Sequence, residues 1–173
     1  MTTFTDSQAV RIDDRDYFDV TLASVEAAKR RIWASLFIYD IRPGQDLEGL
    51  VLELTTALIE RRQCGVDVRV LMTGHVRTQN IAVANLASGL YLAGAGVPQR
   101  RIFSTDAERN GSHAKFAIFD DTAVLGSQNW TDDAFTANIE DAVLLTGSAV
   151  HELAAQFLTL WDNGKGLPKN VAR

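Results

Sequence analysis

The sequence is poor in the residues that cross-link or interrupt a chain. It has one cysteine, Cys64, which excludes an internal disulfide and a cysteine-based metal cluster. It has 3 prolines, and it shows no low-complexity tract and no repeat of fixed period, so nothing indicates a linker or a disordered arm. At 173 residues the chain can bury a sizeable core, and one domain over residues 1–173 is expected.

Long apolar runs are also missing. The apolar stretch 32–41 is far too short to span a bilayer. The segment up to Asp19 carries five aspartates, whereas a secretory signal begins with positive charge and continues with an apolar run. A cytoplasmic location without stable membrane association is therefore expected.

Basic residues do not dominate the composition, and the net charge is −5. A protein that coats nucleic acid usually carries a basic face, so the balance argues mildly against that role. It leaves room for a local basic cleft, for which Arg100 and Arg101 are candidates. The other paired arginines, at 30–31 and 61–62, are interpreted as closing helices, where cations complement the helix dipole.

Apolar periodicity predicts helices first alternating with strands and then strands in a cluster. The helices are expected over 17–31, 46–62, 80–93 and 150–161, and the strands over 32–39, 66–73, 101–104, 114–120, 122–127 and 141–146. Asp46 is expected to cap the second helix, with Leu47 on its inner face. The order predicts an α/β fold: a three-layer sandwich with a mixed, mostly parallel sheet flanked by helices.

The polar residues of the later strands predict a reactive site. Residues two apart on a strand share a face, so His113 and Lys115 are expected to act together, whereas Asp120 lies on the other face and is expected to be structural. Ser127 and Asn129 share a face at the end of the next strand. A hairpin would bring them near the start of the strand that carries His113.

This set of side chains suits a tetrahedral phosphate. The His113 imidazole can attack phosphorus, Lys115 supplies a point charge, and hydroxyl and amide groups donate to non-bridging oxygens. Preorganised donors of this kind each stabilise a transition state by roughly 3 kcal/mol. Glu140 is a candidate to accept the proton on the second ring nitrogen of His113, which would fix the tautomer.

The complete motif has three parts: His113-x-Lys115-x4-Asp120, Gly126-Ser127-x-Asn129 and Asn138-x-Glu140. In order and spacing these parts resemble the signature of the phospholipase D superfamily. The resemblance implies a phospholipase D-like fold and a covalent phosphohistidine on His113. It also implies that Lys115, Ser127 and Asn129 hold the phosphate, that Glu140 orients the histidine, and that no metal or other cofactor is needed.

The motif occurs once, and this constrains the mechanism. In-line displacement puts the leaving oxygen opposite the attacking nitrogen, so one imidazole cannot also protonate it, and a second acid is required. The simplest hypothesis is a homodimer with His113 from both subunits, an arrangement that resembles single-motif members of the superfamily. Of the other histidines, His151 is expected on a solvated helix face, and His75, after a strand, is a candidate substrate contact. Trp130, directly after Asn129, is a candidate to line the pocket.

Three functions remain open. The first is a metal-independent endonuclease acting on DNA or RNA, motivated by small size, one motif and no membrane element. The second is phospholipid hydrolysis or phosphatidyl transfer, which the same site would serve, although no basic amphipathic anchor is evident. The third is a phosphate-binding module of a larger complex, against which the complete motif speaks, because binding alone needs no nucleophile.

Overall fold

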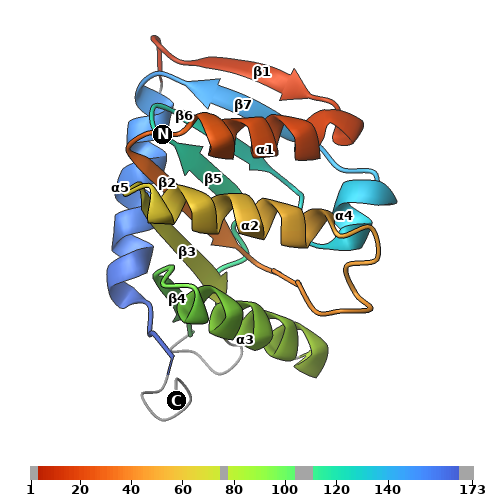
Figure 1. Cartoon of the computed structure of the whole chain (residues 1–173). Helices are drawn as coiled ribbons and strands as arrows, with labels where there is room; N and C mark the ends of the chain where they lie inside the picture. Colours follow the sequence, from red (N-terminus) through yellow and green to blue (C-terminus); the bar gives the residue numbers. More distant parts are fainter. Residues whose placement is uncertain (1–3, 75–77, 104–110, 168–173) are drawn as a thin grey trace.

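The computed structural model describes residues 4–74, 78–103 and 111–167, which form one seven-stranded sheet with helices on both faces (Figure 1). The strands are β1 (Gln8–Ile12), β2 (Arg31–Leu36), β3 (Asp67–Thr73), β4 (Gln99–Ile102), β5 (Phe116–Phe119), β6 (Thr122–Gly126) and β7 (Ala142–Thr146). The helices are the 3-10 turn η1 (Asp14–Asp16), α1 (Tyr17–Ala27), α2 (Leu50–Gln63), α3 (Gln79–Gly94), α4 (Asp132–Thr136) and α5 (Ser148–Asn163).

The strand order in the sheet is β1-β7-β6-β5-β2-β3-β4. Only β2 with β3 and β3 with β4 pair in parallel; the other four neighbouring pairs are antiparallel. The expected α/β class with a mixed sheet and flanking helices is confirmed, but the expectation of a mostly parallel sheet is wrong. Helix-connected strands account for one half of the sheet only, because β5 and β6 form a hairpin and β1 adds an unforeseen antiparallel edge.

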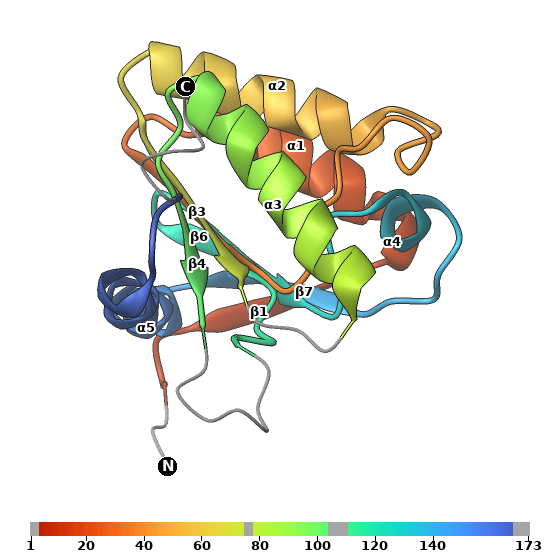
Figure 2. The same cartoon turned by 90° about the horizontal axis from the view of Figure 1, so that it is seen from below.

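Two apolar layers enclose the sheet. Figure 2 shows α1, α2 and α3 on one side and α5 on the other. On the first side α2 buries Leu54 and Leu58 completely, in the core cluster that also holds Ala117 of β5. On the second side Phe157 of α5 stacks on Trp33 of β2, with ring centroids 5.3 Å apart.

The start of α2 differs from the expectation in one respect. Asp46 does satisfy the first turn, since its carboxylate accepts hydrogen bonds from the backbone N–H groups of Val51 and Leu52, at 3.1 and 2.8 Å. The helix itself begins only at Leu50. Leu47 therefore lies in the preceding loop and is 75% exposed, not on the inner face of the helix.

Asp120 explains why α1 is shorter than expected. Its carboxylate accepts hydrogen bonds from the backbone N–H groups of Lys29, Arg30 and Arg31, each at 2.9 Å. These donors point to the β5–β6 turn, so they are not available to prolong a helix. The helix ends at Ala27, and Arg31 opens β2 instead of closing a helix.

No helix among the described residues is long and apolar enough to cross a membrane.

Candidate active site

The motif residues meet at one end of the strands, where β2 ends and β5 begins. This end of the sheet is called the motif edge. Because β5 runs antiparallel to β2, with Ser35 opposite Phe116, the residues before Phe116 lie beside the end of β2. His113 and Lys115 occupy this position. The hairpin partner β6 ends at the same edge, since Gly126 N–H bonds to the Lys115 carbonyl, at 3.2 Å. The hairpin thus brings Ser127 and Asn129 to the side of His113.

His113 and Lys115 are in direct contact. The Lys115 ammonium nitrogen lies 3.2 Å from Nδ1 of His113 and 3.0 Å from the His113 carbonyl oxygen. An ammonium group can only donate, so Nδ1 is the acceptor in this contact. The ring of Phe37 lies under both groups: its centroid is 4.2 Å from that of the imidazole and 5.1 Å from the ammonium nitrogen.

The surroundings lower the pKa of both His113 and Lys115. Desolvation and the charge of Lys115 lower the pKa of His113, which favours the neutral imidazole that a nucleophile needs. Burial also lowers the pKa of Lys115, which is only 9% exposed, while the negative charge of Glu140 opposes that shift. A cation with little solvent around it is well suited to receive an anion.

Ser127, Glu140 and Asn138 form a hydrogen-bonded group next to this pair. The Ser127 hydroxyl donates to one carboxylate oxygen of Glu140, and the side-chain amide of Asn138 donates to the other, at 3.2 Å. Ser127 Oγ also accepts from the Asp141 backbone N–H, at 3.1 Å. The hydroxyl is thereby held in place between β6 and the loop before β7.

Asn129 faces a pocket of about 300 Å³ beside the motif. Its side-chain oxygen accepts from the Ile38 backbone N–H, at 3.1 Å, and its amide nitrogen has no hydrogen-bond acceptor among the described residues. The same pocket contains the Asp40–Arg42 pair, in which both guanidinium bonds are 2.7 Å long. This hydrogen-bonded carboxylate raises the pKa of Arg42 further.

Not every expected residue joins the cluster. No hydrogen bond among the described residues links Glu140 to His113; Glu140 holds Ser127 instead, and Lys115 occupies Nδ1 of the imidazole. Trp130 does not line the pocket, which corrects the expectation: it is fully buried and packs edge-on against Tyr39, at 5.3 Å between centroids. His75 lies outside the described residues.

Phe37 is the site residue that sequence reasoning missed. The motif is confined to residues 113–140, and a phenylalanine at the end of an apolar strand gives no signal of contact with it. Only the antiparallel pairing of β2 with β5 puts that ring under the imidazole. Gly126 belongs to the motif, and the structure supplies the reason for a glycine there: a Cβ would lie 2.3 Å from Gln128 Oε1 and 2.6 Å from the Asp141 carbonyl oxygen.

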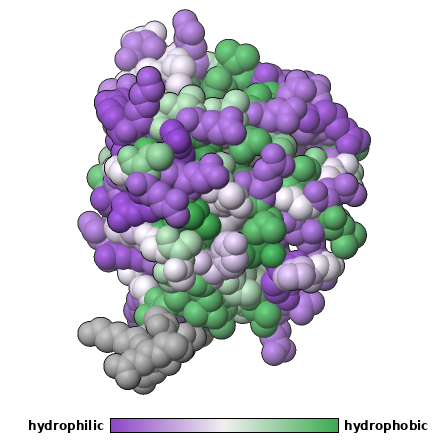
Figure 3. Space-filling model, viewed as in Figure 1, coloured by the Kyte–Doolittle hydropathy of each residue, from purple (hydrophilic) through white to green (hydrophobic). Residues whose placement is uncertain are grey.

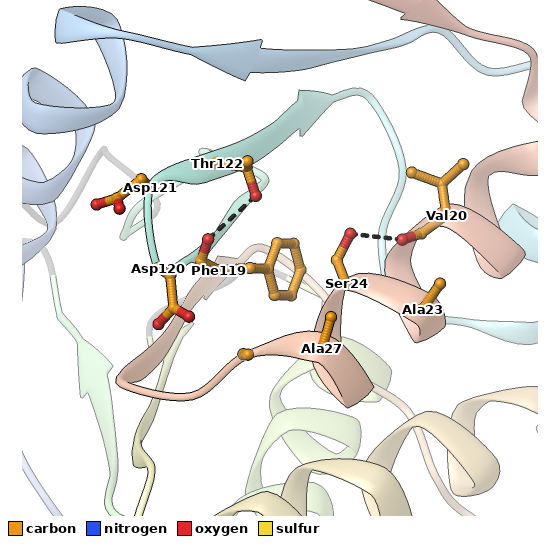
Figure 4. Close-up of a pocket in the computed structure, with 9 residues that line it drawn as sticks. Val20, Ala23, Ser24, Ala27, Phe119, Asp120, Asp121 and Thr122 are labelled. Atoms are coloured by element: carbon orange, nitrogen blue, oxygen red, sulfur yellow. Dashed lines mark hydrogen bonds between the residues drawn. The ribbon is translucent and has the colours of Figure 1, made fainter.

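A larger cavity, of about 540 Å³, lies at the opposite end of β5, between α1 and the β5–β6 turn (Figure 4). The hydroxyls of Ser24 and Thr122 there bond to backbone oxygens of Val20 and Phe119, at 2.6 and 3.0 Å. The only charged residues that line it are Asp120 and Asp121. The Asp120 carboxylate already accepts hydrogen bonds from the backbone N–H groups of residues 29–31. The groups suited to chemistry therefore gather at the motif edge.

Within the described ranges no group of three or more His, Cys, Asp or Glu side chains could hold a metal ion.

Comparison with known proteins agrees with this geometry. The family model described as cardiolipin synthase, phospholipase D-like domain, matches residues 22–161. No curated protein matches the chain.

Several solved structures share the fold. Nuc from Salmonella typhimurium, a phospholipase D family member, superposes with a TM-score of 0.72 at 23% identity, over 94% of this chain and 98% of that one. NucT from Helicobacter pylori gives 0.70 at 14% identity, over 94% and 100%. Phosphatidylserine synthase from Haemophilus influenzae also gives 0.70 at 14% identity, over 95% of this chain but 41% of its own.

Proposed function

The chain belongs to the phospholipase D-like family, and from this premise we propose that it is a metal-independent phosphodiesterase that hydrolyses DNA or RNA. The observation that carries the proposal is the Lys115–His113 contact at 3.2 Å on the ring of Phe37. It combines a nucleophile whose pKa is lowered with a poorly solvated cation. Ser127 and Asn129 stand next to this pair as donors for the phosphate oxygens.

The chemistry takes two displacements. In the first, Nε2 of His113 attacks phosphorus, the N–P bond forms, and the P–O bond to the leaving alcohol breaks. The leaving oxygen takes a proton from a second imidazolium on the opposite side. In the second, that imidazole takes a proton from water, whose oxygen attacks phosphorus as the N–P bond breaks. For Nε2 to attack, Nδ1 must carry the ring proton, so Lys115 must leave Nδ1 and turn to the incoming phosphate.

We propose that the second imidazole is His113 of the partner subunit in a homodimer. The other described histidine, His151, is exposed on α5, on the far side of the sheet from α1, α2 and α3. A surface suited to self-association exists on α3, which has no charged residue over its 16 positions and leaves Val83 and Tyr91 43% and 47% exposed. In Figure 3 apolar side chains gather on the lower part of the helical face, where α3 lies in Figure 1.

Two observations favour nucleic acid as the substrate. The chain spans nearly the whole of Nuc and NucT, whereas it spans 41% of phosphatidylserine synthase. In addition, Arg101 and Lys165 place two cations near the same sheet edge, beside the exposed ring of Phe103. A polyanion meets complementary charge there.

A nuclease panel in EDTA tests the proposal. Wild-type protein is expected to cleave single- or double-stranded DNA or RNA in the presence of chelator, and His113→Ala is expected to lose the activity. Intact substrates throughout the panel would refute it. Mixed dimers of wild-type and His113→Ala chains test the shared site: activity that falls only in proportion to the wild-type fraction speaks against it.

Lipid chemistry is the second candidate, because the matching family model is described as that of cardiolipin synthase. The same nucleophile and phosphate donors would serve, since only the leaving alcohol differs. Vesicles that contain phosphatidylglycerol separate the two functions. Release or transfer of a headgroup, dependent on His113 and without nucleic-acid cleavage, would assign the site to lipids.

A further inference from the structure

Phe103, directly after β4, is an exposed aromatic ring with two cations over it. It is 38% exposed. The Arg101 guanidinium carbon lies 5.5 Å from the ring centroid and the Lys165 ammonium nitrogen 5.9 Å from it. The two cations come from distant parts of the chain, and a two-way backbone bridge between Arg101 and Lys165, at 2.8 and 2.9 Å, holds them together. The backbone bridge therefore fixes Arg101, Phe103 and Lys165 together at the end of β4.

The ring is seated on the backbone of the neighbouring strand. A Cβ at Gly74, directly after β3, would lie 2.7 Å from the Phe103 ring, so the ring can lie over this position only because it is glycine. The Gly74 N–H bonds to the Ile102 carbonyl, at 2.6 Å, which fixes the two strand ends together. One face of the ring is thus covered by backbone.

This group lies on the same side of the sheet as the motif. Gln99 of β4 faces α3, because a Cβ at Gly89 of that helix would lie 3.1 Å from Gln99 Oε1. Arg101 shares this side by alternation, and Phe103 continues it. Lys115 shares its side with Ala117, which packs in the core under α1 and α2.

The group and the motif are also neighbours along the sheet edge. The strands there are in the order β5-β2-β3-β4, so Phe103 lies two strands beyond Phe37. At a spacing of about 4.8 Å between strands, this is a separation of roughly 10 Å. The chain that leads to His113 returns along the same edge, since a Cβ at Gly111 would lie 2.4 Å from both the Ile102 carbonyl oxygen and Thr73 Oγ1.

We propose that Phe103, Arg101 and Lys165 form a nucleotide-binding subsite that holds single-stranded nucleic acid next to the scissile phosphate. A base stacks on the open part of the Phe103 ring, and the two cations receive the phosphate beside that base. A base inside a duplex is already stacked on both faces, so the subsite favours an unpaired strand. The inference rests on the proposed function, because it adds a second contact to the same substrate.

Binding without turnover tests the subsite separately from catalysis. The His113→Ala protein is titrated, in EDTA, into a labelled oligothymidylate and into the same oligonucleotide made abasic, and fluorescence anisotropy is followed. Phe103→Leu keeps an apolar side chain over Gly74 but removes the ring. It is expected to weaken binding of the oligothymidylate about tenfold and to leave binding of the abasic strand nearly unchanged. Phe103→Trp is expected to retain the preference.

The cation is tested by salt dependence. Lys165→Gln is expected to reduce the slope of log K against log salt by about 0.7, the contribution of one phosphate contact on a single strand. Leu158→Ala, which shortens an equally exposed apolar side chain on α5, serves as the control and is expected to bind like its parent. Equal loss of both oligonucleotides in Phe103→Leu, no loss in either, or no binding by the parent overturns the subsite. A different result would refute the proposed nuclease activity: the absence of cleavage by wild-type protein.

Discussion

The ammonium of Lys115 lies 3.2 Å from Nδ1 of His113, and its charge helps to hold the pKa of that histidine below its ordinary value. We expect Lys115→Gln to raise the pKa of His113, because the repulsive charge disappears while desolvation remains. The neutral nucleophile would then be lost at a higher pH. Titration of the His113 ring resonances by NMR measures the shift. An unchanged or lower pKa in Lys115→Gln would contradict the contact.

Glu140 acts on Lys115 and Ser127, and its charge favours the protonated lysine. In Glu140→Gln we expect the pKa of Lys115 to fall further, so phosphate affinity declines at a lower pH than in wild type. The substituted amide keeps an oxygen that can accept from Ser127, while the oxygen that accepts from Asn138 is replaced by a donor. Binding of inorganic phosphate from pH 7 to pH 10 checks this. If the two proteins lose phosphate in parallel, Glu140 does not control the charge of Lys115.

Asp120 links acid stability to the β5–β6 turn. Burial alone would raise the pKa of its carboxyl, but three backbone N–H donors and Arg30 hold it below its ordinary value. A group with a depressed pKa stabilises the fold above its unfolded pKa, near 3.9, and loses that effect as the pH falls through the folded pKa. Asp120→Asn, which also tolerates the left-handed backbone at φ 51°, is expected to cost roughly 1.5–3 kcal/mol at pH 7.

Urea unfolding at pH 7 and at pH 3 measures this cost. The difference between wild type and Asp120→Asn should begin to shrink below the unfolded pKa, since the unfolded carboxyl of wild type is then protonated more readily than the folded one. Asp121→Asn is the matched control: its carboxylate meets the exposed Arg30, and a change of under 1 kcal/mol is expected. A pH-independent difference would exclude the charge of Asp120 as the cause.

Gly126 is required by close approach, not by backbone conformation. Gly126→Ala would bring a methyl group within 2.6 Å of the Asp141 carbonyl oxygen, and we expect a loss of about 1–3 kcal/mol together with displacement of Ser127. Gly94→Ala, at the end of α3 with no atom within 4 Å, should be neutral or slightly stabilising. Thermal unfolding distinguishes the two. Equal behaviour would show that the backbone at 126 moves freely.

The fold was predictable where a helix or strand is long enough for its apolar residues to repeat with a clear period. The inner face of α2 repeats through Leu54 and Leu58, and the alternation of Val68, Val70 and Met72 in β3 identifies the side that packs in the same core. The short antiparallel edge strand β1 was not predicted, since four of its five residues are exposed and show no alternation. Its place depends on pairing with β7, which is more than a hundred residues away in the chain.

The site was predictable in its members but not in its contacts. Spacing grouped His113 with Lys115, and the structure brings them into contact. Spacing could not show whether Glu140 or Lys115 hydrogen-bonds to the His113 imidazole. The hairpin brings both side chains near the ring, and their rotamers decide which one makes the contact. Trp130 was misjudged for a related reason: an isolated bridge between Tyr39 and Trp130 turns its side chain into the core, away from the neighbouring Asn129.

If the proposed dimer forms through the uncharged helix α3, assembly and substrate binding should respond to salt in opposite ways. Contacts through its exposed apolar residues gain from excluded salts such as sulfate, since apolar burial becomes more favourable. Binding of nucleic acid through Arg101 and Lys165 is expected to weaken as the salt concentration rises, because phosphate contacts release counterions. High sulfate is thus expected to preserve the proposed dimer while it releases nucleic acid, so the choice of salt would separate assembly from substrate binding.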